Sequence, residues 1–323
     1  MLVDILFKPD EIKEKENRLK GKAAAVFDVL RATSTIVTAL ANGCAAVHPA
    51  AEIEEALRIA RKLENRNCAR IGSEHPGEER KTMPRAKTKT PAKNRPEEEK
   101  SAAKGVLLGG ERGGERVPGF MLGNSPLEYG PETVRGRVLV LTTTNGTRAI
   151  RLAAEKAEPL LIGSLLNARA TAEKLWMLKK DAVLICAGTD GDFSLEDAVA
   201  AGVVAGEILR LAQKEGEGRA GSVRVKETPA AKAENAAPEG VRLTDAAVAA
   251  VRLAEYYGKD ITNAFFESRH GQKLLCLGRR EDLEYCSRRN VYNLVPCYER
   301  GKNLILPLRN EQAGVKINNV ERT

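Results

Sequence analysis

The segment 109–126 combines glycine, arginine and glutamate in a way that suits an anion-binding site. Its sequence is GGERGGERVPGFMLGNSP, and it directly follows the apolar run 106–108. Glycine lets the backbone approach a ligand closely and turn N–H groups toward it. Arginine adds forked donors for phosphate, sulfonate or carboxylate oxygens, and glutamate can hold a hard cation beside them. The segment predicts an anion site with a metal, the alternative being a surface loop with solvated charges.

Further polar residues follow apolar runs along the chain. In an open parallel sheet the ligand lies beyond the carboxyl ends of the strands, where helix N-termini favour phosphate. Four clusters occupy such positions: Asp28 with Arg31, Glu111 with Arg112, Thr143 to Asn145, and Asp190 with Asp192, Glu196 and Asp197. Their convergence predicts one site at one edge of the sheet.

Each of these residues also has a simpler structural interpretation. Asp28 is either a ligand or a cap for the following turn, and Arg31 three residues later favours the ligand. Ser194 and Asp197 fit a capping box, which leaves Glu196 as the preferred carboxylate for metal or general-base work. The residues predicted to be catalytic are Asp28, Arg31, Glu111, Arg112, Glu196 and Asp197. Those predicted to bind substrate are Ser34, Arg116, Asn124, Ser125, Thr144, Asn145, Gly146 and Thr147.

Several phosphatase chemistries lack their residues in this chain. No cysteine precedes an arginine at cysteine-phosphatase spacing, Asp28 lacks a second aspartate two positions later, and the Walker A pattern is absent. Arg269-His270-Gly271 imitates a histidine phosphatase signature, but it lies in a helical pattern and no histidine follows it. We expect His270 at a helix surface or interface. Water attack assisted by Mg²⁺ is the simplest remaining route, with Asp28 and Glu111 as expected metal ligands.

Taken together, five blocks resemble the 2-phosphosulfolactate phosphatase family. They are 28–35 (DVLRATST), the GERxG and GFxxGNSP patterns within 109–126, 142–147 (TTTNGT), 187–198 and the run from 267 to 296. The resemblance covers most of the chain except two polar insertions. It implies hydrolysis of (2R)-O-phospho-3-sulfolactate to sulfolactate and phosphate, on the route to coenzyme M or a related sulfonate. The alternatives are a Mg²⁺-dependent phosphatase that acts on another small anionic phosphoester, or a non-catalytic anion-binding protein.

Composition excludes some functions and locations. Aromatic residues make up only 4% of the 323 residues, which disfavours stacking on bases. The six cysteines lack C-x-x-C spacing, and neither a membrane-length apolar run nor a signal-peptide pattern is present. A cytoplasmic protein is therefore expected. Its expected partner is a small anionic phosphoester, a homodimer is left open, and neither nucleic acid nor membrane is expected.

Apolar runs of about 5–7 residues alternate with helical patterns over most of the chain. The expected strands are 23–30, 44–49, 137–143, 160–165 and 182–187, and the expected helices 33–42, 52–63, 147–156, 170–179 and 195–213. Helical patterns at 244–257, 262–277 and 281–288 and strand patterns at 290–298 and 303–308 follow. The predicted fold class is α/β, with mostly parallel sheet layers flanked by helices.

Two polar segments interrupt this pattern. Residues 73–104 hold nine Lys/Arg and six Glu and supply +3 of the net charge of +8, and we interpret them as a disordered insertion. Residues 214–240 are interpreted as a flexible insertion. It either separates two packed α/β halves or is a long loop within one fold. Residues 1–213 would then carry most site loops, and 241–323 would contribute C-terminal helices and closing strands packed on them.

Overall fold

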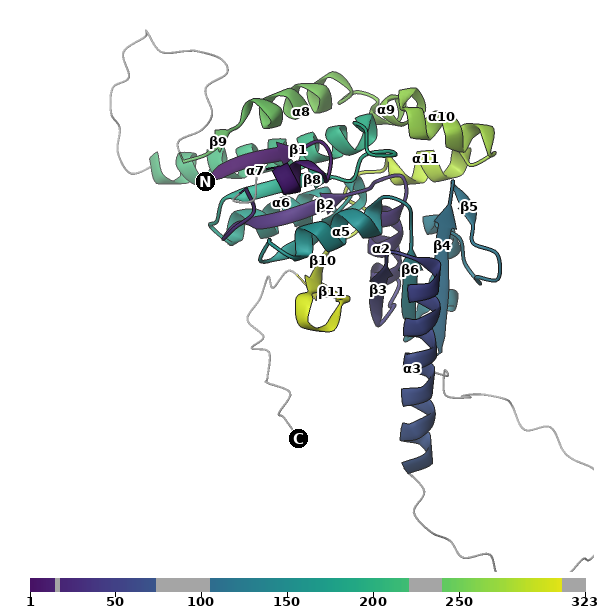
Figure 1. Ribbon diagram of the computed structural model, residues 1–323. Helices are drawn as coiled ribbons and strands as arrows, with labels where there is room; N and C mark the ends of the chain where they lie inside the picture. Colours follow the sequence, from purple (N-terminus) through teal and green to yellow (C-terminus); the bar gives the residue numbers. More distant parts are fainter. Residues whose placement is uncertain (15–17, 74–104, 221–239, 310–323) are drawn as a thin grey trace, which may run out of the picture.

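Short buried strands, most of them followed by helices, form one large mixed sheet in the computed structural model (Figure 1). The structure describes residues 1–14, 18–73, 105–220 and 240–309. The strands are β1 Leu2–Leu6, β2 Ala23–Phe27, β3 Ala46–Ala50, β4 Val106–Arg112, β5 Glu115–Arg116, β6 Val138–Thr142, β7 Leu160–Gly163, β8 Ala182–Cys186, β9 Arg242–Leu243, β10 Leu294–Glu299 and β11 Leu304–Arg309. Their order across the sheet is β5-β4-β6-β3-β11-β10-β7-β2-β8-β1-β9. The predicted α/β class is confirmed.

The helices follow the strands much as the apolar pattern predicts. They are α1 Glu11–Glu14, α2 Ala32–Ala41, α3 Ile53–Ser73, α4 Pro131–Val134, α5 Gly146–Ala154, α6 Ala168–Met177, α7 Leu195–Ala220, α8 Asp245–Tyr256, α9 Ile261–Glu267, α10 Arg269–Cys276 and α11 Arg280–Cys286. Short 3-10 turns lie at Pro126–Glu128 (η1), Leu165–Asn167 (η2) and Arg300–Lys302 (η3). Among the described residues, no helix is both long and apolar enough to cross a membrane.

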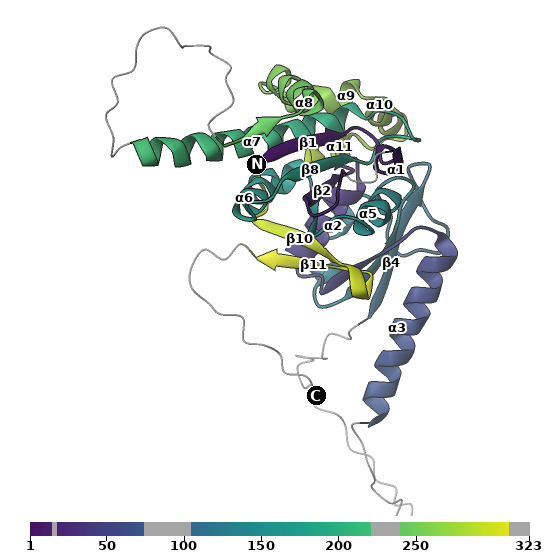
Figure 2. The same cartoon turned by 60° about the vertical axis from the view of Figure 1, so that its left-hand side comes forward.

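The two closing strands lie in the middle of the sheet. β10 and β11 form an antiparallel hairpin, visible beside the main strands in Figure 2. Cys297 of β10 pairs with Leu161 of β7, and Ile305 of β11 pairs with Val47 of β3. This hairpin joins two parallel groups, β4-β6-β3 and β7-β2-β8-β1. The C-terminal segment therefore completes the sheet.

Alternate residues of β2 pack on opposite faces of the sheet, as strand geometry requires. Ala23, Ala25 and Phe27 join a core built largely from α6 to α11, whereas Ala24 and Val26 join a core built with α2 and α5. All five residues are fully buried. Helices on both faces exclude water from this strand, and its carboxyl end is held between two packed cores.

The structure differs from the sequence interpretation at several elements. The single helix expected over 262–277 is wrong: Ser268 ends α9 and caps α10, its Oγ accepting from the N–H of Gly271 at 3.0 Å. α7 continues to Ala220, so 214–220 are helical. α3 continues to Ser73, and Figures 1 and 2 show its C-terminal end projecting beyond the sheet. The remainder of the two expected insertions, 74–104 and 221–239, lies outside the described residues.

Gly202→Ala is expected to destabilise the fold by about 1–3 kcal/mol, the usual cost of overpacking. α7 and α8 pack so closely there that a Cβ would overlap the backbone oxygen of Ala250. Gly206→Ala on the same helix is the matched control, because a Cβ there meets nothing within 4 Å and alanine favours helix by about 1 kcal/mol. Thermal melts of both variants test this. Equal melting temperatures would contradict it.

Candidate active site

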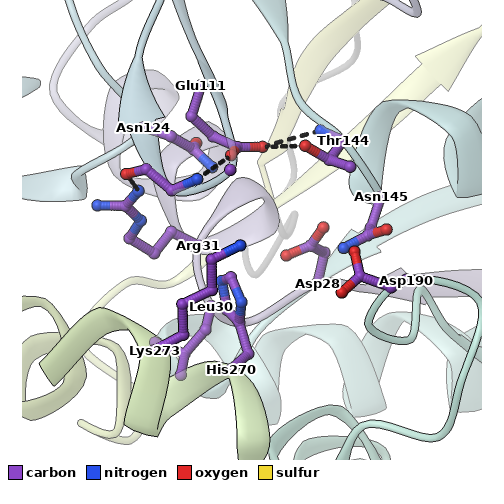
Figure 3. A pocket seen from close by; sticks show the side chains of 12 residues that line it. Asp28, Leu30, Arg31, Glu111, Asn124, Thr144, Asn145, Asp190, His270 and Lys273 are labelled. Carbon is purple, nitrogen blue, oxygen red and sulfur yellow. Dashed lines mark hydrogen bonds between the residues drawn. The ribbon is translucent and has the colours of Figure 1, made fainter. Parts of the chain in front are cut away.

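A cavity lined largely by polar residues opens where several strands end (Figure 3). Asp28 follows β2, Glu111 lies at the end of β4, Thr144 and Asn145 follow β6, and Asp190 follows β8. α10 covers the cavity from the C-terminal part of the chain. The lining residues are Asp28, Leu30, Arg31, Glu111, Gly113, Gly114, Asn124, Thr144, Asn145, Asp190, His270 and Lys273. The structure thus brings at least one residue of each predicted strand-end cluster to one place.

Asp28 is a buried carboxyl group at the start of α2. Its Oδ1 accepts from the N–H of Ala32 at 3.3 Å. Its pKa is raised from the ordinary 3.8 to about 7, mainly by burial and then by the charges of Glu111 and Glu196. The Ala32 N–H and the Arg31 charge act in the opposite direction. Near neutral pH, Asp28 can therefore gain or lose a proton.

The start of α5 packs directly against Asp28. A Cβ on Gly146 would lie 2.7 Å from Asp28 Oδ2 and 2.6 Å from the Cβ of Ala32. Only glycine at position 146 therefore lets the first turn of α5 approach the carboxylate this closely. The preceding residue, Asn145, is the N-cap of α5 but its side chain makes no capping bond. Its side chain lines the cavity.

Glu111 holds two loops together at the cavity. Its Oε2 accepts from the N–H of Gly114 at 2.7 Å, and its Oε1 accepts from the N–H and Oγ1 of Thr144 at 2.8 and 2.9 Å. These bonds join the β4–β5 turn to the loop after β6 (Figure 3). Much of the hydrogen-bonding capacity of Glu111 is already used.

Two of the basic groups on the cavity come from α10, which sequence reasoning did not assign to the site. His270 and Lys273 are three residues apart, so they share one helix face. Burial is the main cause that lowers the pKa of His270 to about 4, followed by the Arg31 charge, so its imidazole is neutral at pH 7. Arg269 ties α10 to the β8 loop through Asp190 at 3.4 Å and Asp192 at 3.2 Å. The Arg-His-Gly signature marked this segment, but its helical pattern suggested a surface role.

The guanidinium of Arg112 lies away from the cavity. Its Nη2 donates to the backbone oxygen of Ala51 and to Thr142 Oγ1, both at 3.0 Å, and lies 3.8 Å from Glu52. Arg112 therefore joins the start of α3 to β6. The arginine that the structure brings to the cavity is Arg31, which is only 3% exposed.

Four other residues predicted to bind substrate donate hydrogen bonds to protein atoms and do not line the cavity. The hydroxyls of Ser34, Thr147 and Ser125 donate to Val29 O, Thr143 O and Asp282 Oδ1, at 2.9, 2.8 and 2.5 Å respectively. Arg116 donates to Met121 O at 3.3 Å and lines a separate hollow with Glu115, Glu128 and Arg279. Among the predicted substrate ligands, Asn124, Thr144 and Asn145 line the cavity, with Gly146 against Asp28.

Glu196 and Asp197 are both buried and do not line the cavity. Asp197 accepts from the N–H groups of Val29 and Gly188 at 2.8 and 3.2 Å, so it joins the loops after β2 and β8. Burial, then the charges of Glu196 and Asp28, raise the pKa of Asp197 well above its usual range. Burial is also the main cause that raises the pKa of Glu196. Their effect on the cavity is electrostatic, through Asp28.

Comparison with known proteins assigns the chain to a family. The model of the 2-phosphosulpholactate phosphatase family matches residues 6–83 and 87–301. The chain belongs to this family. A probable 2-phosphosulfolactate phosphatase of Clostridium acetobutylicum is 33% identical over 304 residues, which cover 94% of this chain and 100% of that protein. Proteins of the same name from Clostridium tetani and Symbiobacterium thermophilum are 36% and 35% identical, covering 93% and 89% of this chain and 99% and 96% of theirs. The expected class, a phosphoric monoester hydrolase, is confirmed.

The cavity offers oxygen donors of the kind that Mg²⁺ prefers. Asp28 faces it, and Asn124 Oδ1 is buried without a hydrogen-bond partner within the described part of the chain. No group of three or more His, Cys, Asp or Glu able to hold a metal occurs among the described residues. Mg²⁺ commonly uses only one or two carboxylates, with water and phosphate completing its shell. Asp28 and Asn124 therefore fit Mg²⁺ better than the already engaged Glu111.

Arg112→Ala is expected to keep kcat/KM within about threefold of the parent protein while costing about 1 kcal/mol of stability, since it loses only structural contacts. Arg31→Lys is the paired variant, and its kcat/KM is expected to fall about a hundredfold because an ammonium cannot replace the fork. Steady-state kinetics and thermal melts of both variants make the comparison. A large loss of turnover in Arg112→Ala at unchanged stability would instead return Arg112 to the catalytic group.

Asp28→Asn is expected to abolish turnover yet stabilise the fold at pH 8. The folded-state pKa of Asp28 lies above its ordinary value, so the folded protein binds this proton more tightly and the ionised carboxylate lowers stability at high pH. The rise of the Asp28 pKa from 3.8 to about 7 sets an upper limit of about 4 kcal/mol on this gain. The gain should shrink as pH falls from 7 toward 4. Chemical denaturation at pH 8 and pH 5 measures it, and a variant less stable than the parent at pH 8 would refute the assignment.

Proposed function

We propose that this protein hydrolyses (2R)-O-phospho-3-sulfolactate to sulfolactate and phosphate with the help of Mg²⁺. The observation that carries the proposal is that the cavity is built from the part of the chain that matches the family model. Every residue lining the cavity, from Asp28 to Lys273, falls inside the ranges 6–83 and 87–301 that match the family model. Full-length relatives named as probable 2-phosphosulfolactate phosphatases support the same substrate.

The charges on the cavity support a metal-bound, multiply anionic substrate. Three carboxyl groups line it, those of Asp28, Glu111 and Asp190, against the cations of Arg31 and Lys273. A substrate with phosphate, carboxylate and sulfonate groups would be repelled by this balance unless a cation accompanied it. The proposed Mg²⁺ removes this repulsion.

Opposite sides of the cavity suit different parts of such a substrate. In Figure 3, Asp28, Asn145 and Asp190 gather on one side, and Arg31, His270 and Lys273 on the other. We assign the phosphoryl group to the space between the two sides, with Arg31 on one side of it and the N–H groups at the start of α5, which favour anions, on the other. Lys273 and the neutral His270 would face the carboxylate or sulfonate.

The chain's own residues would prepare the reaction. Asp28 and Asn124 would hold the metal, which supplies neutralisation of the phosphoryl oxygens and orientation of water. Asp28 would release its proton when the metal binds, because ligation requires the carboxylate. Asp190, the carboxylate beside Asp28 and Asn145 in Figure 3, is assigned to accept the proton of the attacking water. Arg31 would stabilise charge on the phosphoryl group.

The proposed place of the reaction follows from the substrate. Sulfolactate is the product expected on a route to coenzyme M or a related sulfonate. We propose that the reaction belongs to that route and that the protein acts in the cytoplasm.

Phosphate release from a panel of phosphoesters tests this function. The panel contains 2-phosphosulfolactate, 2-phospholactate without the sulfonate, glycerol phosphate and p-nitrophenyl phosphate, each with Mg²⁺ and with excess chelator. We expect kcat/KM for 2-phosphosulfolactate to be at least about tenfold higher than for the other three esters, which is the usual scale of one charged contact. We expect no turnover of any ester in excess chelator. Equal rates on 2-phospholactate would favour another small anionic phosphoester. Full turnover in chelator would overturn the metal assignment.

A further inference from the structure

We propose that Asp282 is a positioning residue that fixes the guanidinium of Arg31, so that its Nε–H, which has no partner in the protein, meets the substrate's phosphoryl oxygen. This inference rests on the proposed function, because it assigns the cavity to a phosphoester. It goes beyond that function by identifying what orients Arg31 and which of its nitrogens has no partner in the protein.

Both ends of the Arg31 fork are already bound by the protein. Nη1 donates to Asp282 Oδ2 at 2.7 Å, and Nη2 donates to the backbone oxygen of Gly114 at 2.6 Å. The side chains of Arg31 and Asp282 are only 3% and 4% exposed. The guanidinium is therefore held at two points, and water cannot readily replace either partner.

Asp282 is itself held in place. It lies in the first turn of α11, and its Oδ1 accepts from Ser125 Oγ at 2.5 Å. Ser125 is the N-cap of η1, and its Oγ also accepts from the N–H of Leu127 at 3.3 Å. The carboxylate of Asp282 is thus fixed between two segments, with one oxygen for Ser125 and the other for Arg31. A rigid carboxylate leaves the bound guanidinium little freedom to rotate.

Two polar atoms of cavity-lining residues lack partners. Across the described ranges, Arg31 Nε and Asn124 Oδ1 are buried side-chain atoms without a hydrogen bond. Buried donors are nearly always paired, so an orphan on a cavity indicates a ligand that completes it. The Arg31 Nε–H requires an acceptor, such as an anionic oxygen. Asn124 Oδ1 requires a donor or a cation, as the proposed metal would provide.

A purely structural ion pair makes a different prediction. A buried pair often contributes little net stability, and if Asp282 served only to join α11 to α2, its loss would change the melting temperature and leave ligand binding intact. If Asp282 positions Arg31, its loss changes phosphate affinity in a protein that still folds. Affinity, measured beside stability, therefore separates the two roles.

Chemical rescue tests the positioning role directly. Arg31→Ala removes the guanidinium and is expected to weaken binding of inorganic phosphate about tenfold or more, measured by calorimetry with Mg²⁺ present. Added guanidinium at millimolar concentration should restore binding, because Asp282 and the oxygen of Gly114 still form its seat. Methylammonium has the same charge but no fork, and it is the control that should not restore binding.

The double variant Arg31→Ala/Asp282→Asn should show no rescue by guanidinium, and Asp282→Asn alone should weaken phosphate binding about tenfold. Equal rescue in the single and double variants would overturn the positioning role, as would parental phosphate affinity in Asp282→Asn. If the double variant fails to fold, Arg31→Ala/Ser125→Ala takes its place. The Ser125→Ala change loosens Asp282 without removing its negative charge, and reduced rescue by guanidinium is expected.

The same measurements keep this inference separate from the substrate assignment. Inorganic phosphate is bound whichever phosphoester the enzyme prefers. If 2-phosphosulfolactate is a poor substrate but rescue by guanidinium requires Asp282, the proposed function fails and the positioning role stands. If 2-phosphosulfolactate is turned over well but rescue by guanidinium does not depend on Asp282, the proposed function stands and the positioning role fails.

Discussion

The buried ion pair between Arg31 and Asp282 is the interaction on which the cavity depends. Arg31 follows the carboxyl end of β2, whereas Asp282 belongs to α11, more than two hundred residues later in the chain. From Arg31 the contacts continue through the oxygen of Gly114, and from the N–H of Gly114 to Glu111, which binds Thr144. One continuous set of hydrogen bonds therefore joins the loops after β2, β4 and β6 to the C-terminal helices. Because each partner is buried, breaking one bond leaves a desolvated polar group, which makes the whole set resist local opening.

A second constraint is the concentration of buried acids at the carboxyl ends of β2 and β8. Asp28, Glu196 and Asp197 are each at most 7% exposed, and burial raises the pKa of all three. Such a group of carboxyls destabilises the folded state at high pH, and a fold selected only for stability would replace some of them. For Asp197, hydrogen bonds from two backbone N–H groups offset part of the free-energy cost of burying the carboxyl group. Asp28 has a single backbone donor and faces the cavity, so its cost is best explained by chemistry there.

Much of the fold could be predicted from the sequence because its strands are short, apolar and separated by helices. The apolar runs at β2, β6 and β8 fall within the predicted strands, and their polar ends meet at one edge for the reason that applies to any parallel sheet. Less could be predicted of the C-terminal part. Ser268 ends one helix and caps the next, but within an otherwise periodic segment a serine gives no clear stop signal. The central position of β10 and β11 depends on pairing with strands far away in the chain, which local periodicity does not encode. The same is true of α10, so His270 and Lys273 were not assigned to the site.

The choice between Arg31 and Arg112 shows why spacing alone was insufficient. Glu111 and Arg112 are adjacent, and their types together suggested one functional pair. They lie within β4, however, where successive side chains point to opposite faces of the sheet. Once Glu111 turns toward Gly114 and Thr144, Arg112 must point away, and it meets Ala51 and Thr142 instead. Arg31 is not subject to this alternation, because it lies in the turn between β2 and α2, and from there its side chain reaches Asp282. Which of the two arginines lines the cavity is therefore determined by where each lies relative to its strand, a property of the three-dimensional fold that the order of residues sets only indirectly.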